Sequence, residues 1–113
     1  PEFRVLSGDD GLALAAWALG AEGVVSVASN VAPAQMVELW DHWKAGRIAQ
    51  ARETDLSLAP LYRALFLESS PAPAKAAASI LGLCRDEVRL PLVPASRSTR
   101  EALEAALATA GLR

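Results

Sequence analysis

Hydrophobic and polar residues follow a strand pattern first and a helical pattern afterwards. Residues 3–7 form a short β-compatible run, and residues 23–29 form a second run that is rich in valine. The second run is mainly apolar without in–out alternation, which is typical of a strand buried on both faces of a parallel sheet. Between the runs, residues 11–19 favour a helix that Gly20 would end. The pattern predicts a strand–helix–strand unit with parallel strands.

The chain after Asn30 has helical periodicity. Pro33 suits a first helical turn, and apolar residues then recur at helical spacing until Gly46, namely at Met36, Trp40 and Trp43. A second helical face follows, in which Pro60 is expected to introduce a kink or an interruption. This face consists of Ile48, Ala51, Asp55, Leu58, Tyr62 and Leu65.

The C-terminal part is predicted to hold two more helices, joined by a connector with prolines. Pro71 and Pro73 each disfavour the α conformation of the residue before them. Residues 68–75 therefore predict an extended entry to an alanine-rich helix that Gly82 would stop. Residues 89–94, RLPLVP, predict an extended, packed connector rather than a central strand.

A capping box is predicted at the start of the last helix. Ser98 is followed three residues later by Glu101, which is the spacing at which a hydroxyl and a carboxylate satisfy backbone donors reciprocally. Gly111 would end this helix. Its buried stripe is predicted to consist of Ala102, Leu103, Ala106, Leu107 and Ala110.

Composition limits the class of protein. The 113 residues fit one ordinary domain, and 52% hydrophobic with 21% charged residues is a globular balance. The net charge of −2 and the scattered basic residues indicate no phosphate-binding patch, so nucleic acid is not an expected partner. No stretch approaches the ~20 apolar residues of a membrane span. Cys84, the single cysteine, has no partner for an internal disulfide, so a reducing cytoplasm is the expected compartment.

The predicted sheet is incomplete within this sequence. Two short parallel strands need both faces covered and further neighbours, so something outside these residues is expected to complete the sheet. The N-terminal residues enter a strand pattern almost at once, without a basic region followed by an apolar one. We therefore expect a cut through a larger chain, or a processed end, rather than a signal peptide.

The turn after the first strand carries the candidate chemistry. Asp9 and Asp10 are paired carboxylates that suit acid–base work or ligand binding, and acids at this position equally favour helix capping. In a (β/α) barrel, the turn after a strand's C-terminal end lies on the face that carries the active site. Ser7 and Gly8 would then share the pocket rim, where Gly8 allows close backbone approach.

Other chemistry-bearing residues favour structural roles. His42 lies between two tryptophans on a predicted helix, without a second ligand or carboxylate partner, so packing or surface exposure is the favoured interpretation. Cys84 follows a helix stop and is interpreted as a buried structural thiol. The three tryptophans are expected in the core or in a subunit contact. No metal-ligand spacing appears, and no cofactor is predicted.

Several of these segments together resemble one enzyme family. VLSGDD, GAEGVVSVASNVAP, PLYRALFLESSPAPAKAAASILGL and RLPLVP occur in the order and spacing of the C-terminal part of the dihydrodipicolinate synthase family. This family belongs to the pyruvate-dependent class I aldolase superfamily of TIM barrels. The resemblance covers nearly the whole chain. It is specific at superfamily level only when the motifs are taken together.

The resemblance implies an α/β fold that is mostly helical within this chain. Residues 1–31 would hold the last two barrel strands with their intervening helix. Residues 32–46 would be the last barrel helix, and residues 47–113 a C-terminal helical extension. The family is a lyase that condenses pyruvate, held as a Schiff base on a lysine, with aspartate semialdehyde in lysine and diaminopimelate biosynthesis. A homo-oligomer, a tetramer by resemblance, and a missing N-terminal barrel portion are the implied partners.

The resemblance also implies substrate-binding positions. Gly8 would approach the substrate through its backbone, Asp9 and Asp10 would border the second substrate, and the Val25 carbonyl would face the Schiff-base site. A Schiff-base lysine would project from a barrel strand into a closed site. The two lysines of this chain, Lys44 and Lys75, lie on predicted helices instead. No catalytic residue is therefore predicted in this chain, which we expect to be a fragment that is inactive by itself.

Alternatives to the synthase stay open. The sialic acid lyase branch of the superfamily places a second acid after the aspartate that matches Asp10, where this chain has Gly11, so the synthase is favoured. Ser70 stands where the family commonly has asparagine, which leaves a related 2-keto-acid aldolase open. A different class of protein also fits the residues: a stand-alone helical interaction module whose strands pair with a partner or with a second copy.

Overall fold

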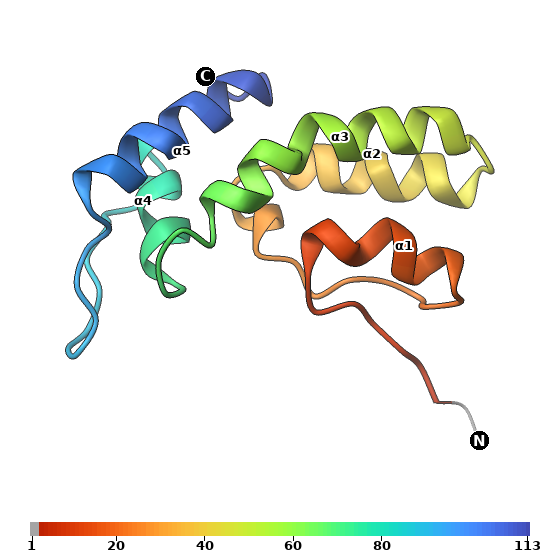
Figure 1. The fold of residues 1–113 in the computed structure, drawn as a ribbon, viewed down its shortest axis with the longest axis horizontal. Coiled ribbons are helices and arrows are strands. Elements are labelled where there is room, and N and C mark those ends of the chain that lie inside the picture. Colours follow the sequence, from red (N-terminus) through yellow and green to blue (C-terminus); the bar gives the residue numbers. More distant parts are fainter. Residues whose placement is uncertain (1–2) are drawn as a thin grey trace.

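The computed structural model describes residues 3–113 and is mostly helical (Figure 1). It measures 41 × 34 × 20 Å along its principal axes. In chain order the elements are the 3₁₀ helix η1 (Asp10–Leu12), α1 (Ala13–Ala18), the 3₁₀ helix η2 (Ala28–Asn30), α2 (Pro33–Lys44), α3 (Ile48–Ala64), α4 (Ala72–Ile80) and α5 (Arg97–Thr109).

The two predicted strands pair in parallel but only over one bridge. Ser7 is bridged to Val24 in parallel orientation, and the Ser7 N–H donates to the Gly23 carbonyl at 2.9 Å while the Val25 N–H donates to the Ser7 carbonyl at 2.8 Å. Within residues 3–113 this pairing does not extend into a ladder of several residues. The reason is that each segment lacks the second neighbour that a buried parallel strand requires. The expected burial of both strand faces is absent as well: the Val25 residue is 66% exposed.

The helix between the paired segments begins as predicted at the aspartates. Asp9 is the N-cap of η1, and its Oδ1 accepts a hydrogen bond from the Gly11 N–H at 2.8 Å. The chain then continues into α1 and leaves it through Gly20, whose φ of +101° disfavours any residue with a Cβ. The predicted stop at Gly20 is confirmed.

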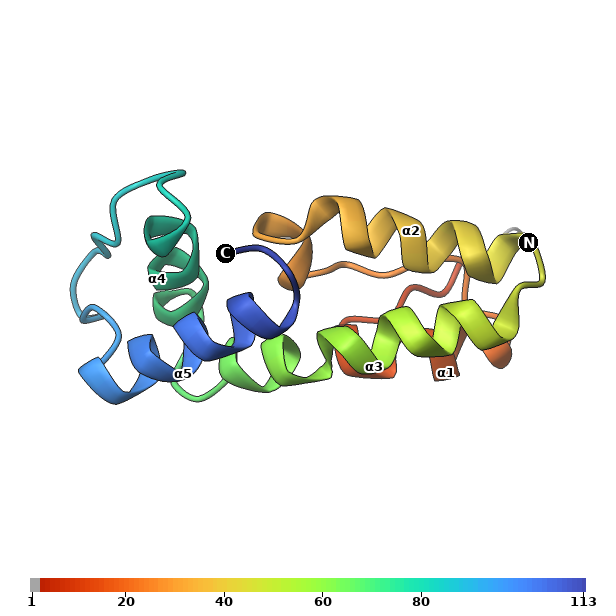
Figure 2. The same cartoon turned by 90° about the horizontal axis from the view of Figure 1, so that it is seen from above.

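Helices α2 and α3 form a pair joined at Gly46, which has a φ of +71° (Figures 1 and 2). Trp17 of α1 packs edge-to-face on Trp40 of α2, with ring centroids 4.9 Å apart. Pro60 lies inside α3 without interrupting it, and the ribbon bends in this part of the helix (Figure 1). The expected kink is therefore present, whereas the expected interruption is not, because the flanking turns remain packed in the core.

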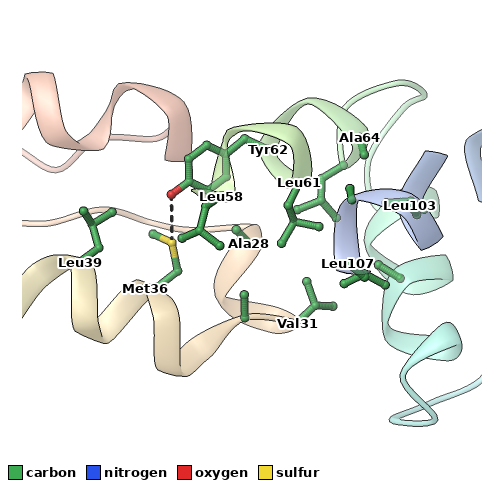
Figure 3. Packing of buried hydrophobic residues seen from close by; sticks show 14 of the residues in the cluster. Ala28, Val31, Met36, Leu39, Leu58, Leu61, Tyr62, Ala64, Leu103 and Leu107 are labelled. Atoms are coloured by element: carbon green, nitrogen blue, oxygen red, sulfur yellow. Dashed lines mark hydrogen bonds between the residues drawn. The ribbon is translucent and has the colours of Figure 1, made fainter. Parts of the chain in front are cut away.

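A leucine-rich core joins the end of α3 to α4 and α5 (Figure 3). The fully buried side chains here are Leu61 of α3, its C-cap Leu65, and Leu103 and Leu107 of α5. The stripe predicted for the last helix is thus confirmed at its centre, while its outer members Ala102 and Ala110 are half-buried. Burying such side chains stabilises the fold by about 1.5–3 kcal/mol each.

Three local predictions for the C-terminal part are wrong. The cap of α5 is Ser96, whose Oγ accepts from the Thr99 N–H at 3.3 Å, and Ser98 with Glu101 forms no capping box. Glu101 pairs instead with Arg97, with Nε and Oε1 2.8 Å apart. The box pattern misleads here because serines stand two residues apart and both have an acid or a hydroxyl three residues later.

The entry to α4 and the connector after it also differ from expectation. Ala72 is already helical although Pro73 follows it, because proline lacks only an N–H that the first helical turn leaves unpaired. Residues 89–94 are irregular and not packed: Leu90 is 90% exposed and Val93 is 65% exposed. Apolar composition therefore did not predict burial in this connector.

Candidate functional site

The turn that follows the first paired segment is held by its own polar groups. The Ser7 Oγ–H donates to the Asp9 carbonyl at 2.8 Å, and the Asp9 N–H donates to the Ser7 Oγ at 3.2 Å. Ser7 is buried, whereas Gly8 and Asp9 are exposed. An added Cβ at Gly8 would meet nothing within 4 Å, so no atom of the described chain requires glycine there.

Asp10 connects this turn to the turn that follows the second segment. Its Oδ2 accepts hydrogen bonds from the Val27 N–H at 3.0 Å and from the Ala28 N–H at 2.9 Å. The residue is only 2% exposed, and its Oδ1 is buried without a hydrogen-bond partner among residues 3–113. Capping was predicted for Asp9 or Asp10; Asp9 caps its own helix, and Asp10 binds the backbone of a distant turn.

The four predicted substrate-binding residues lie around one short pairing. Gly8, Asp9 and Asp10 follow Ser7 directly, and Val25 is bound to Ser7 through its N–H. The sequence missed the contact between Asp10 and the second turn. It carries no local signal, because 17 residues separate the carboxylate from the Val27 amide that it binds.

One side chain of the C-terminal extension lies next to this turn. Tyr62 of α3 lies beside Gly11, where an added Cβ would come 3.8 Å from the tyrosine Cδ2. The Tyr62 hydroxyl donates to the Met36 Sδ at 3.5 Å (Figure 3). Burial raises the pKa of Tyr62 above its ordinary value, and the charges of Asp55 and Asp10 raise it further. Burial also raises the pKa of Asp55, and the Tyr62 hydroxyl offsets part of that rise.

Both lysines lie on helices away from this turn. The Lys44 Nζ stands 5.5 Å from the centroid of the Trp40 ring, a cation–π contact at the end of α2. The Lys75 Nζ donates to the Glu87 carbonyl on the connector before α5. Neither side chain is bonded to residues 7–10 or 23–28 in the described part of the chain.

His42 and Cys84 depart from their predicted surroundings. The His42 Nε2 lies 3.4 Å from the Glu38 carboxylate one turn earlier, and the Arg47 Nε donates to the His42 Nδ1 at 2.9 Å. The histidine therefore has a carboxylate partner, contrary to the prediction. Cys84 is exposed rather than buried. Within residues 3–113 no group of three His, Cys, Asp or Glu side chains is placed to hold a metal ion.

An apolar groove lies beside the candidate site but does not include it. It has a volume of about 330 Å³ and is lined by Trp17, Gly23, Val24, Ser26, Ser29, Pro33, Met36, Val37 and Trp40. None of the four predicted substrate-binding residues lines it. No helix among the described residues is both long and apolar enough to cross a membrane.

Comparison with known proteins gives consistent matches over the whole chain. The 4-hydroxy-tetrahydrodipicolinate synthase of Rhodospirillum centenum is 48% identical over 113 residues, which are 99% of this chain and 38% of that protein. The crystal structure of dihydrodipicolinate synthase from Thermotoga maritima is 46% identical with a TM-score of 0.96, covering 99% of this chain and 38% of that one. The chain thus spans about 38% of the length of these relatives.

A second similar structure carries a ligand. It is the chloride-inhibited dihydrodipicolinate synthase from Acinetobacter baumannii complexed with pyruvate, 40% identical with a TM-score of 0.92, covering 98% of this chain and 38% of that chain. The structural neighbours are TIM-barrel enzymes, and a mostly helical chain is consistent with a partial segment of them. The model of the dihydrodipicolinate synthetase family matches residues 1–110, so the chain belongs to this family.

Proposed function

We propose that these residues are the C-terminal part of a lyase that condenses pyruvate with aspartate semialdehyde in lysine and diaminopimelate biosynthesis. The observation that carries the proposal is the match of nearly the whole chain to 4-hydroxy-tetrahydrodipicolinate synthases at 38% of their length. The pyruvate complex of the Acinetobacter baumannii relative supports pyruvate as one substrate. A portion upstream would complete the barrel and supply the lysine that forms the Schiff base.

The proposed domain layout follows the resemblance. Residues 1–31 would close the barrel, residues 32–46 would cover its outside as the last barrel helix, and residues 47–113 would form the extension. The parallel bridge between Ser7 and Val24 supports this layout, because adjacent barrel strands run parallel. The complete protein would be a cytoplasmic homo-oligomer.

The residues at the paired turns have separate proposed roles. The exposed backbone of Gly8 and the exposed carboxylate of Asp9 would border the second substrate. The Val25 carbonyl would face the Schiff base and accept a hydrogen bond there. The resemblance implies a substrate contact for Asp10 too, although its carboxylate is bonded to backbone amides.

The chain alone would not catalyse the reaction. A Schiff base needs a lysine whose amine is desolvated in a closed site, because only the neutral amine attacks the pyruvate carbonyl. Lys44 is exposed on α2, and Lys75 is bonded to a carbonyl of the connector. These surroundings support an upstream nucleophile.

Intact mass and borohydride trapping test the proposal. Mass spectrometry of the source protein is expected to give a species about two to three times this length, in keeping with a chain that spans 38% of its relatives. Pyruvate with borohydride should then add a reduced adduct to a lysine of that species, while a sample without pyruvate should gain nothing. A full-length protein without an adduct contradicts the proposal, and an adduct on the 113-residue chain contradicts its predicted inactivity.

A second substrate test separates the synthase from other aldolases. Aspartate semialdehyde added to the trapped system should be consumed together with pyruvate. A protein that forms the adduct but does not consume aspartate semialdehyde would be the related 2-keto-acid aldolase that Ser70 leaves open.

A further inference from the structure

We propose that Asp10 is a positioning residue, which fixes the backbone around Val25 by binding the next turn, and that it does not contact substrate. The inference rests on the proposed function, because it concerns how that site is held. Asp9 and Asp10 are adjacent acids with opposite surroundings: Asp9 is exposed, and Asp10 is 2% exposed. A carboxylate that is enclosed in this way has no free approach to a substrate.

The bonds of Asp10 reach across the site. One oxygen, Oδ2, accepts from two successive amides, Val27 N–H at 3.0 Å and Ala28 N–H at 2.9 Å. These amides stand at the start of η2, whose N-cap Val27 offers no side-chain cap of its own. Amide donors at a helix start are otherwise unpaired, and a carboxylate is a strong acceptor for them. Asp10 therefore caps η2 from a distant part of the chain.

As a result, hydrogen bonds hold the backbone on both sides of the Val25 carbonyl. The Val25 N–H donates to the Ser7 carbonyl at 2.8 Å, and two residues later the Val27 N–H donates to Asp10. With both flanking groups held, the peptide unit that carries the Val25 carbonyl has little freedom to rotate. The two anchors, Ser7 and Asp10, belong to the same turn, so this one turn sets the direction of the carbonyl.

Asp9 provides the matched control for this role. Its Oδ1 binds the Gly11 N–H two residues away at 2.8 Å, which is a local cap without effect on the second turn. Replacing Asp9 removes an acid from the same loop and leaves the bonds to Val27 and Ala28 intact. Any effect that Asp10 has through those bonds should therefore be absent in an Asp9 variant.

The test combines amide hydrogen exchange with kinetics on the full chain that the intact mass identifies. In Asp10→Ala the Val27 and Ala28 amides are expected to exchange about 10- to 100-fold faster, because two hydrogen bonds to a charged group are lost. In Asp10→Asn, which keeps an oxygen acceptor, the increase should stay below about tenfold. In Asp9→Ala these two amides should be unchanged.

Kinetics show whether the held geometry matters. Asp10→Ala should lower kcat by about 10- to 100-fold, because a small misplacement of a catalytic group costs rate. The KM for aspartate semialdehyde should stay within about threefold, and Asp10→Asn should recover most of kcat. A KM that rises tenfold or more at unchanged kcat would instead indicate a direct substrate contact and overturn the proposal. So would unchanged exchange at Val27 and Ala28 in Asp10→Ala.

Asp10→Asn serves as the test where Asp10→Ala does not fold. Full loss of kcat in Asp10→Asn, with the Val27 and Ala28 amides still protected, would contradict a positioning role. The exchange measurement does not depend on catalysis. A wild-type protein that forms no pyruvate adduct would refute the proposed function, and the exchange rates would still decide whether Asp10 holds the second turn.

Discussion

The N-terminal segment (residues 3–31) and the helical body (residues 33–113) bury their apolar side chains to different extents. In the helical body, Leu58, Leu61 and Leu107 are fully buried within the chain. In the N-terminal segment, Phe3 is 84% exposed and Val25 is 66% exposed, although both belong to apolar runs. The leucines at the centre of the helical body therefore find their packing partners within these residues, whereas apolar side chains of the paired N-terminal runs stay exposed.

The buried part of the N-terminal segment lies against α2 and α3. Trp17 and Ala28 are buried in the common core, and Asp10 holds the two turns together. The opposite face and the free sides of the paired segments have no partner among the described residues. Unpaired strands with apolar side chains associate with other chains. The comparison thus predicts stability from the helical body and association from the N-terminal segment.

The largest expected effect tests the helical body. Leu58→Ala removes a fully buried side chain from α3 and should lower the free energy of unfolding by about 2–5 kcal/mol, since it leaves a cavity. Leu56→Ala, on the same helix at 60% exposure, should change it by less than about 0.5 kcal/mol. Urea denaturation of both variants checks the difference. Similar losses would mean that the core does not lie where the structure places it.

The next effect tests the N-terminal segment. Val25→Lys puts a charge on the exposed paired segment and should weaken self-association of the 113-residue chain about tenfold, because one apolar contact is lost. Leu90→Lys, at a residue that is 90% exposed in the connector, is the control and should leave association unchanged. Sedimentation velocity over a range of concentrations measures both. A stronger effect of Leu90→Lys would move the association surface to the connector.

A smaller effect tests the corrected cap of α5. Ser96→Ala should lower the free energy of unfolding by about 1 kcal/mol, because the Thr99 N–H loses its acceptor. Ser98→Ala should be nearly neutral, since Ser98 lies inside the helix. The pair is measured by thermal or urea unfolding. An effect confined to Ser98 would restore the capping box that the sequence pattern indicated.

The smallest effect is a pH slope from Asp55. Its pKa is raised from 3.8 by burial, so the folded state holds this proton more tightly than the unfolded state does. The contribution of Asp55 to stability is therefore greatest at low pH and is lost as pH rises through the raised pKa. Asp55→Asn should gain stability relative to wild type as pH rises from the ordinary value of 3.8 through the raised pKa, as urea denaturation at several pH values would show.

Glu68 supplies the control of opposite sign. Hydrogen bonds from Ser96 and Thr99 lower its pKa, so its contribution is present above the ordinary value of 4.5 and is lost as pH falls through the lowered pKa. Glu68→Gln should therefore lose stability relative to wild type as pH rises across that window. Slopes of the same sign in the two variants would contradict these assignments.

Much of the fold was predictable because its signals are local. Glycine at positive φ marks helix ends whatever the surroundings, and Gly20, Gly46, Gly82 and Gly111 each have a φ between 70° and 101°. Helical spacing likewise predicted the buried Met36 and Leu58. Local signals failed where two candidates compete, as Ser96 and Ser98 do, and where exposure depends on distant segments, as at Leu90 and Cys84.

For the candidate site, the sequence and its resemblance named residues but did not predict their surroundings. The resemblance brought Gly8, Asp9, Asp10 and Val25 together, and one parallel bridge places them around Ser7. Nothing in the residues near Asp10 distinguishes it from Asp9. The difference arises because the chain returns to Asp10 with the amides of Val27 and Ala28, a contact that no local pattern encodes.

The sequence by itself determined the family, the helices and their ends at glycine, since motif order, periodicity and glycine positions act over a few residues. Only the tertiary structure decided which acid caps locally and which binds a distant turn, and which apolar runs are buried. Burial and long-range hydrogen bonds depend on which segments meet in space, and for residues 3–7 and 23–29 the described chain provides only part of that surface.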